Sequence, residues 1–331
     1  MKAIVTGGGG FIGSHVVETL VQIGYHVIVL DNFTTGRREN LTHISKEIRI
    51  VECDISKSGE WIREFRGIKW VFHIAALADI VPSIQQPDEY FQANVTGTFN
   101  VLQASRIEGV ERFIYVASSS CYGEPTVVPT PEVAEIRPQY PYALTKYLGE
   151  EMVLHWAKVY RLPALSLRLF NVYGPRSRTS GTYGAVFGVF LAQKLAGQPF
   201  TVVGDGKQTR DFTYVTDIVE ALIASARSDY SGKVYNVGSG DTISVNRLVN
   251  LLGGEKVHIP KRPGEPDCTF ADITRIREEI GWIPRVSIED GVKNLVEQID
   301  YWRNAPIWTP DSIAEATKDW FYFLGDKKGS G

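Results

Sequence analysis

The chain has 331 residues, of which 44% are hydrophobic and 22% are charged, and its formal net charge is −3. This composition is typical of a water-soluble globular protein, and the small net charge gives no reason to expect binding to nucleic acid or to a membrane. The three cysteines are too few and too scattered for a disulfide framework or a zinc site, so we expect no metal. The apolar N-terminus fits a first strand better than a signal peptide, and no run approaches transmembrane length, so we expect a cytoplasmic location.

Residues 2–5 form the first predicted strand, and four glycines separate it from a segment with helical spacing. Gly7, Gly10 and Gly13 fall where a side chain would obstruct the turn, an approaching phosphate or the packing of the helix on the strand. The start of the helix offers free backbone N–H groups and the positive end of the helix dipole. The segment therefore predicts a pyrophosphate site, although a glycine pattern alone also fits a tight structural turn.

The second predicted strand, residues 26–30, leads to Asp31, about 20 residues beyond the glycine turn, where an acidic side chain can bind a ribose hydroxyl. Its carboxylate would repel the 2′-phosphate of NADP, so we predict NAD as the cofactor. Arg37 and Arg38 follow closely and keep NADP open as an alternative.

Strand-like runs alternate with helical segments through the first half of the chain. The further predicted strands are residues 48–53, 70–74, 113–117 and 164–169, and the predicted helices are residues 55–65, 90–108 and 142–160. This alternation predicts an α/β fold of Rossmann type, a doubly wound parallel sheet with helices on both faces. In such sheets ligands bind beyond the carboxyl ends of the strands, where this chain places its polar clusters.

Glycine and proline become frequent after about residue 172, and helices no longer alternate strictly with strands. We expect residues 1–171 to form an NAD-binding Rossmann domain and residues 172–325 to form mainly a smaller, mixed α/β substrate-binding lobe. A segment at about 212–236 is predicted to cross back to the sheet. Residues 326–331 are predicted to be a flexible tail.

Tyr142 and Lys146 lie four residues apart, so they share one face of the predicted helix. An ammonium group beside a phenol favours the phenolate, which would lower the pKa of Tyr142 toward the range of a general base. Ser118 follows a predicted strand, where its hydroxyl could bind the same substrate oxygen. A tyrosine and a lysine at this spacing are often only helix neighbours, but with the dinucleotide turn and Ser118 they predict a catalytic site.

Two other side chains have suitable chemistry but unpromising positions. His73 could act as a base, yet it lies within a predicted strand, so we expect a core histidine with satisfied hydrogen bonds. Cys121 could be a nucleophile, yet a small, buried packing residue is the simpler interpretation.

The chain resembles the extended short-chain dehydrogenase/reductase family, and within it the nucleotide-sugar epimerases and dehydratases, most nearly the UDP-hexose 4-epimerases. The resemblance covers nearly the whole chain through the segments TGGGGFIG, VFHIAA, YPYALTK, RLFNVYGPR, GDGKQTRDFTYVTD and RPGEPD. It implies that Tyr142 takes the proton of the sugar 4-hydroxyl, that Ser118 bonds this oxygen and that Lys146 holds the nicotinamide ribose. Hydride leaves C4 for NAD, and the keto sugar then turns over and receives hydride on its other face.

The resemblance also implies the binding residues. Besides Tyr142 and Lys146, the expected NAD contacts are Gly7, Gly10, Phe11, Ile12, Gly13, Asp31, Asn32, Thr35, Gly36, Asp54, Ile55, Ile74, Ala75, Ala76, Asn94 and Phe170. Besides Ser118, the expected substrate contacts are Asn171, Arg210, Arg262, Glu265 and Thr269. The two arginines could clamp a diphosphate, so the expected partner is a nucleotide sugar, a UDP-sugar before others.

The residues after Ser118 bear on the reaction. Similar dehydratases carry an Asp-Glu pair there and related decarboxylases a glutamate, whereas this chain has Ser119 and Ser120. This difference disfavours dehydration and decarboxylation and predicts an NAD-dependent 4-epimerase. The alternative is a 4-dehydrogenase that releases the keto sugar, and the intact catalytic residues argue against a non-enzymatic nucleotide-binding protein.

Thr269 bears on the sugar, because similar enzymes place a gate for the 2-substituent at this position. The small threonine predicts room for an N-acetyl group, so both UDP-hexoses and UDP-N-acetylhexosamines stay open as substrates.

A homodimer is expected from the predicted helices 90–108 and 142–160, because pairing them with their copies gives a four-helix contact. The apolar side chains that could supply this contact are Phe99, Leu102, Leu148, Met152 and Trp156.

Overall fold

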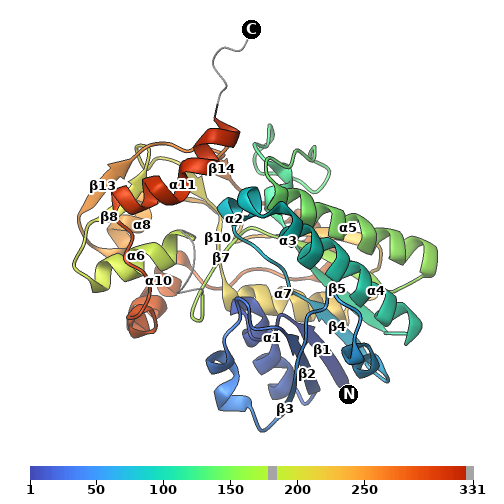
Figure 1. Ribbon diagram of the computed structural model, residues 1–331. Coiled ribbons are helices and arrows are strands. Elements are labelled where there is room, and N and C mark those ends of the chain that lie inside the picture. The colour runs from blue at the N-terminus through green and yellow to red at the C-terminus, as the bar shows by residue number, and fades with distance from the viewer. Residues whose placement is uncertain (178–184, 326–331) are drawn as a thin grey trace.

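The computed structural model describes residues 1–177 and 185–325, and the tail expected at 326–331 lies outside them. Within the described chain, seven parallel strands form the main sheet in the order β11-β6-β5-β4-β1-β2-β3 (Figure 1). These strands are β1 Lys2–Thr6, β2 His26–Asp31, β3 Ile48–Glu52, β4 Trp70–His73, β5 Arg112–Ser118, β6 Ala164–Leu169 and β11 Lys233–Val237. The predicted doubly wound parallel sheet is confirmed.

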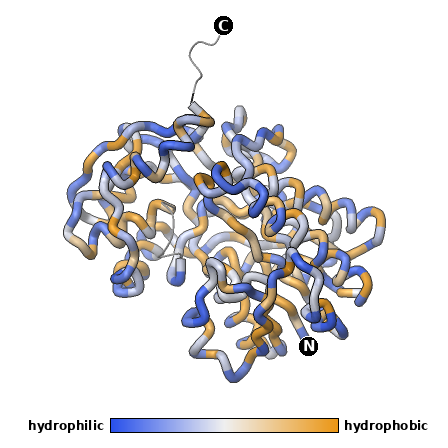
Figure 2. The backbone as a smooth tube through the Cα atoms, in the orientation of Figure 1, coloured by the Kyte–Doolittle hydropathy of each residue, from blue (hydrophilic) through white to orange (hydrophobic). Residues whose placement is uncertain are grey.

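The strands of this sheet are nearly continuous hydrophobic runs, because helices cover both of their faces. All six residues of β6 are buried, and Figure 2 shows hydrophobic residues concentrated in the sheet. The chain order reverses between β1 and β4, since β2 and β3 extend the sheet on one side and β5, β6 and β11 on the other. Ligands of doubly wound sheets bind at such a switch point.

Helices α1 (Phe11–Gln22) and α7 (Val215–Arg227) cover one face of the sheet, and α4 (Gly97–Ile107) and α5 (Pro141–Tyr160) cover the other. Leu20 and Leu222 belong to the first of these hydrophobic cores, and Leu102 and Val153 to the second. Burial of each such side chain contributes about 1.5–3 kcal/mol to folding. The two cores hold the carboxyl ends of the strands in fixed positions.

The helix predicted at residues 55–65 is wrong over its first half, because only a 3₁₀ helix at Glu60–Phe65 forms there. The Asp54 side chain accepts hydrogen bonds from the backbone N–H and the hydroxyl of Ser56, which makes a local turn that competes with a helix. Gly59 is extended and directly precedes the 3₁₀ helix.

The helix predicted at 90–108 is present but interrupted. It consists of α3 (Pro87–Phe91), a π-helical turn (Gln92–Thr96) and α4. π-Helical turns often mark functional sites. Here the turn contains Asn94, one of the expected cofactor contacts.

The chain after β6 builds a further core beside the main sheet. Its aromatic and aliphatic members include Phe187, Phe200, Leu248 and Trp302. The elements outside the main sheet in this part are β7 Asn171–Tyr173, α6 Val186–Leu195, β8 Phe200–Val203, β9 Thr209–Arg210, β10 Phe212–Tyr214, β12 Ile243–Ser244, α8 Val245–Leu252, β13 Lys256–Ile259, β14 Cys268–Thr269, α9 Thr274–Ile280, α10 Ile288–Glu297, the 3₁₀ helix Ile299–Trp302 and α11 Pro310–Leu324. From this region α7 and β11 return to the main sheet, whereas the boundary at residues 171 and 172 stays a prediction.

Helix α11 links the C-terminal region to the first half of the chain. Thr309 and Ser312 form a capping box that fixes its start. It packs on α2 (Ile80–Gln85), where the Gln85 amide donates a 2.6 Å hydrogen bond to Asp319 (Figure 1). Trp320 donates its indole N–H to the carbonyl of Pro263 at 2.8 Å. The helix thereby fastens α2 to the loop that follows β13.

The helices expected to form a dimer contact are α3, α4 and α5. Leu102 is fully buried in the core beneath them, so this member of the expected apolar surface is wrong. Phe99 is 41% exposed and contacts Trp156 edge to face. Within residues 1–177 and 185–325, no helix combines the length and the hydropathy needed to cross a membrane.

Candidate active site

A cavity of about 710 Å³ runs along the carboxyl ends of the sheet strands. One end is lined by the glycine turn and Asp31, the middle by Ser118 and Tyr142, and the other end by Arg210 and residues further along the chain. The cavity therefore joins the predicted dinucleotide and substrate regions. Its lining provides for a dinucleotide and a second ligand that meet beside Tyr142.

The glycine turn has no room for side chains. A Cβ atom at Gly13 would lie 2.1 Å from the carbonyl oxygen of Gly7, and one at Gly7 would lie 2.7 Å from the backbone nitrogen of Ala75. Gly7 also has a φ of +70°, in the left-handed region that glycine adopts readily. Backbone N–H groups at the start of α1 thus border the cavity without obstruction, which fits the pyrophosphate of NAD.

Asp31 ends β2 and is buried at the edge of the cavity. Its two carboxylate oxygens accept hydrogen bonds of 2.8 Å from the backbone N–H groups of Gly9 and Phe33. Burial raises its pKa, and these two bonds oppose the rise. Arg38 stacks on the Phe33 ring at 4.1 Å and pairs with Glu52. A carboxylate held in this way can accept the hydroxyls of a ribose, as NAD requires.

The structure brings nearly all of the expected cofactor contacts to one cavity. Those that line it are Gly7, Gly10, Phe11, Ile12, Gly13, Asp31, Asn32, Thr35, Gly36, Asp54, Ile55, Ile74, Ala75, Ala76, Tyr142 and Phe170. Asn94 lies behind the wall instead, because its amide bonds to the backbone N–H and carbonyl of Leu77 and to the Thr145 hydroxyl. It positions the Leu77 segment.

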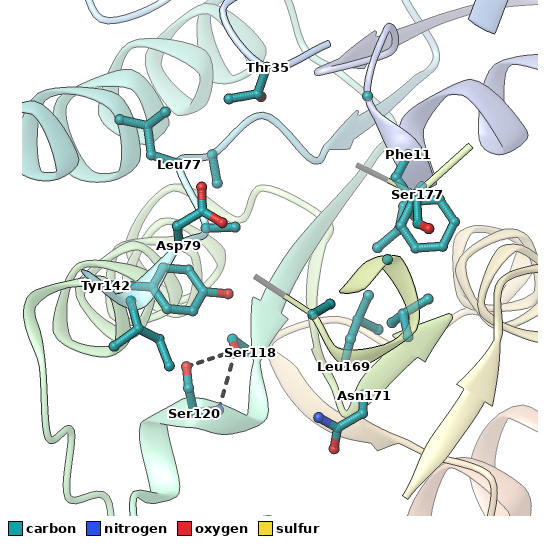
Figure 3. A pocket seen from close by; sticks show the side chains of 18 of the residues that line it. Phe11, Thr35, Leu77, Asp79, Ser118, Ser120, Tyr142, Leu169, Asn171 and Ser177 are labelled. Carbon is teal, nitrogen blue, oxygen red and sulfur yellow. Dashed lines mark hydrogen bonds between the residues drawn. The ribbon is translucent and has the colours of Figure 1, made fainter. Parts of the chain in front are cut away.

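Ser118 ends β5, and Tyr142 lies in the first turn of α5, where Pro141 occupies a position that tolerates proline. Figure 3 shows both hydroxyl groups pointing into the cavity. The Ser118 Oγ lies 2.7 Å from the Ser120 Oγ and accepts a 3.2 Å hydrogen bond from the Ser120 backbone N–H. Burial raises the pKa of Tyr142, and hydrogen bonding to Ser118 opposes this rise. The predicted lowering of this pKa is therefore wrong in direction, because desolvation outweighs the favourable contacts.

Lys146 lies one turn after Tyr142 but does not line the cavity. Its ammonium group lies 4.4 Å from the centre of the Tyr115 ring, and the Tyr115 hydroxyl donates to the Lys146 carbonyl. Only 4% of the lysine is exposed, and burial lowers its pKa to about 7, against the opposing effect of Glu150. Lys146 is thus poised to gain or lose its proton near neutral pH.

Glu150 and Arg168 form a buried ion pair below these residues, with a shortest distance of 2.5 Å. Ser166 donates to the same carboxylate at 2.8 Å, and Arg168 also donates to the Tyr122 hydroxyl at 2.7 Å. The network joins α5 to β6. It fixes the helix that carries Tyr142 and Lys146.

The expected substrate contacts also reach the cavity: Ser118, Asn171, Arg210, Arg262, Glu265 and Thr269 all line it. Arg210 donates to Glu265 at 2.9 Å, and Arg262 lies 3.8 Å from the same carboxylate. The Thr269 hydroxyl donates to the Asn171 side chain at 2.8 Å. The arginines that could clamp a diphosphate are therefore held together by one acidic partner.

Three further residues of the cavity wall were not predicted from the sequence. Tyr140 is stacked on Tyr142 with ring centres 6.3 Å apart, and Trp320 of α11 lies beside Tyr140 and under the Arg262 guanidinium. Asp79 precedes α2 and also faces the cavity. Tyr140 adjoins the Tyr142 motif and could have been suspected, whereas nothing near Trp320 in the sequence points to the site.

His73 and Cys121 have the structural roles that were predicted. His73 is fully buried, with its ring nitrogens 2.7 Å from the Thr6 hydroxyl and 2.9 Å from the Thr98 hydroxyl, and burial lowers its pKa to about 3. Cys121 is buried, which raises its pKa to about 12. Neither group can act as a base or nucleophile in this state.

The sheet, the glycine turn and the cavity with its serine and tyrosine define a Rossmann-type enzyme that uses a dinucleotide. Residues 3–238 match the NAD dependent epimerase/dehydratase family, and the chain belongs to this family. The cofactor is NAD.

Similar proteins include both epimerases and enzymes of other reactions. The putative UDP-glucose 4-epimerase of Methanocaldococcus jannaschii is 35% identical over 301 residues, which cover 88% of this chain and 96% of the relative. The crystal structure of UDP-glucose 4-epimerase with UDP-glucose from Thermotoga maritima is 36% identical with a TM-score of 0.85, covering 92% of this chain and 99% of that chain. A UDP-glucuronic acid 4-epimerase from Bacillus cereus, in complex with UDP-glucuronic acid and NAD, is 30% identical with a TM-score of 0.84 and the same coverage. Other relatives are named as decarboxylases or as a dehydratase. The family is therefore established, while the reaction must be argued from the site.

Proposed function

We propose that this protein is an NAD-dependent nucleotide-sugar 4-epimerase that acts on UDP-hexoses, UDP-N-acetylhexosamines or both. The observation that carries the proposal is the pair of hydroxyls of Ser118 and Tyr142, which face one cavity beside the glycine turn. A sugar whose 4-hydroxyl bonds to both of them is held for oxidation and reduction at C4.

The roles of the residues follow from their surroundings. Tyr142 accepts the proton of the sugar 4-hydroxyl and returns it later, and Ser118 donates a hydrogen bond to the same oxygen. When bound, NAD supplies the site that takes up and returns the hydride of C4. Lys146, whose pKa is lowered to about 7, carries a positive charge in its protonated form, and this charge favours the ionised form of Tyr142. Arg210, held by Glu265, binds the diphosphate of the nucleotide.

The residues beside Ser118 favour epimerisation over dehydration or decarboxylation. Ser119 and Ser120 carry hydroxyls where an acid and a base would be needed for elimination, and Ser120 is bonded to Ser118. A 4-dehydrogenase remains the alternative, because it would use the same groups and differ only in releasing the keto sugar.

The experiment compares the wild type with Tyr142→Phe, which removes the hydroxyl and keeps the ring that stacks on Tyr140. Loss of a general base typically costs about 10²–10⁴-fold in rate. We expect UDP-glucose and UDP-N-acetylglucosamine to yield their 4-epimers with the wild type, and kcat to fall by this factor in the variant while NAD stays bound. Mass spectrometry and chromatography identify the sugar, and absorbance at the reduced-nicotinamide band detects net oxidation. Near-normal turnover of the variant would refute the role of Tyr142, and a released keto sugar would favour the dehydrogenase.

We further infer a homodimer formed through α4 and α5, supported by the exposed Phe99 and its neighbour Trp156 on this face. Two-fold pairing of these helices would bury the edge-to-face aromatic pair.

A further inference from the structure

Trp320 of α11 contacts the loop after β13 through both its N–H group and its ring. The indole N–H donates a 2.8 Å hydrogen bond to the Pro263 carbonyl, and the guanidinium carbon of Arg262 lies over the ring, 5.4 Å from its centre. This distance is within the range of a cation–π interaction, for which tryptophan is the best aromatic partner. Only 5% of Trp320 and 12% of the Arg262 side chain are exposed, so the interaction is shielded from water.

The position of the indole is fixed by contacts with three parts of the chain. Helix α11 packs on α2, where the Gln85 amide donates to Asp319, the residue before Trp320 (Figure 1). The Trp320 ring lies 6.4 Å from the ring of Tyr140, which lines the cavity just before α5. The third part is the loop after β13. The ring face below Arg262 is therefore preorganised and does not have to be ordered when a ligand binds.

The charges around Arg262 do not by themselves fix its guanidinium group. Glu265 accepts a 2.9 Å hydrogen bond from Arg210, whereas its other carboxylate oxygen lies 3.8 Å from the Arg262 guanidinium, too far for a hydrogen bond. Two cationic groups beside one carboxylate also repel each other. A contact through the face of an aromatic ring takes up no N–H donor, so the indole can orient Arg262 without competing with an anionic ligand.

We propose that Trp320 is a positioning residue for the substrate, because it holds the Arg262 guanidinium in the orientation that binds the diphosphate of the nucleotide sugar. The inference rests on the proposed function, which places this diphosphate at Arg210. Helix α11 is then part of the substrate site as well as of the fold. Because Trp320 acts through Arg262 and not on the catalytic hydroxyls, it contributes to substrate affinity and not to the rate of the chemical step.

The test is a double-mutant cycle on the affinity for UDP, with Trp320→Leu, Arg262→Met and the double variant. Trp320→Phe is the conservative variant, because it keeps an aromatic face and loses the N–H bond to Pro263. Phe321→Leu is the matched control, because it changes the next residue of α11, which is 38% exposed and does not line the cavity. Titration calorimetry of the NAD-loaded enzyme measures UDP affinity, and chromatography of the products gives kcat and KM for UDP-glucose. The NAD content and thermal unfolding check the fold of each variant.

We expect Trp320→Leu to weaken UDP binding by about tenfold, and Trp320→Phe to weaken it by no more than about threefold. KM for UDP-glucose should rise by the same factors while kcat changes by less than about twofold, whereas a purely structural role would lower kcat and the NAD content as well. In the Arg262→Met background, Trp320→Leu should weaken UDP binding by less than about twofold. Phe321→Leu should leave UDP affinity unchanged.

Several outcomes would overturn the inference. They are a wild type that does not bind UDP, wild-type affinity in Trp320→Leu, an undiminished loss in the Arg262→Met background, and an equal loss in Phe321→Leu. If Trp320→Leu does not fold, Trp320→Phe decides, because its smaller loss must also vanish without Arg262. Failure of the proposed function is recognised separately, since UDP binding needs no turnover: if no sugar is epimerised at C4 but the coupling is present, the epimerase assignment fails and the role of Trp320 stands.

Discussion

Replacing Glu150 by glutamine should destabilise the protein strongly, although the two side chains have nearly the same shape. The side chains of Glu150 and Arg168 are only 1% and 6% exposed, and glutamine would leave the guanidinium buried without its counter-charge. Breaking a buried pair from one side costs about 3–5 kcal/mol. Glutamine still accepts one hydrogen bond from Arg168, so we expect the free energy of unfolding to fall by about 3 kcal/mol, the lower end of this range. At about 2 °C per kcal/mol for a large chain, the midpoint of thermal unfolding should fall by about 6 °C.

The assay is thermal unfolding followed by circular dichroism, with urea unfolding as a second measurement. Glu151→Gln is the matched control, because it makes the same chemical change at the next, exposed residue of α5. The double variant Glu150→Leu/Arg168→Met removes both charges and should regain much of the loss, since a buried pair replaced as a unit is often near neutral. Equal midpoints for Glu150→Gln and Glu151→Gln would refute the argument.

The same substitution should change the activity profile. Glu150 raises the pKa of Lys146, against the larger effect of burial. Without the charge of Glu150, Lys146 loses its proton at a lower pH. The decline of kcat/KM on the alkaline side should therefore begin at lower pH in Glu150→Gln than in the wild type. An unchanged profile would show that the charge of Lys146 does not support the reaction.

Further predictions concern stability, specificity and assembly. Lys146→Met should raise the free energy of unfolding by a few kcal/mol below pH 7, and this gain should shrink as the pH rises toward 10.5. The reason is that, between these pH values, the folded wild type binds fewer protons than the unfolded chain. Urea unfolding at a series of pH values tests this, and a gain independent of pH would contradict it. Thr269→Tyr should lower kcat/KM for UDP-N-acetylglucosamine relative to UDP-glucose by about 10–100-fold, since a ring would fill the space beside C2 and break the bond to Asn171; an unchanged ratio would remove Thr269 as the gate. Light scattering at micromolar concentration should give the mass of a dimer, and Phe99→Glu should give a monomer; a monomeric wild type would refute the proposed interface.

The features that the sequence predicted well depend on short stretches of chain. The glycine turn follows from the glycine pattern within residues 7–13. Ser118 and Tyr142 meet because Ser118 ends a strand of the sheet and Tyr142 lies in the first turn of the helix packed on it. The doubly wound parallel sheet follows from the alternation of strands and helices along the chain, whereas the order of its strands was not predicted.

The features that the sequence did not predict depend on partners that lie far away in the chain. The pairing of Arg210 with Glu265 and the contact of Arg262 with Trp320 depend on how loops fold against α11. The raised pKa of Tyr142 likewise comes from burial by the whole cavity wall, which the spacing from Lys146 could not reveal. Side-chain spacing gives neighbours, whereas burial is set by the assembled fold.

The position of β11 at the edge of the main sheet has a consequence during synthesis. It pairs with β6, all of whose residues are buried, and it comes from residues 233–237. Until the ribosome has released the 68 residues from Phe170 to Val237, β6 has an uncovered edge of backbone N–H and carbonyl groups, the kind of edge that pairs with other chains. At roughly 5–20 residues per second this exposure lasts about 3–14 seconds. We therefore expect a nascent chain of this protein to bind chaperones that shield unpaired strands. A fragment ending near residue 171 would keep this unpaired edge permanently.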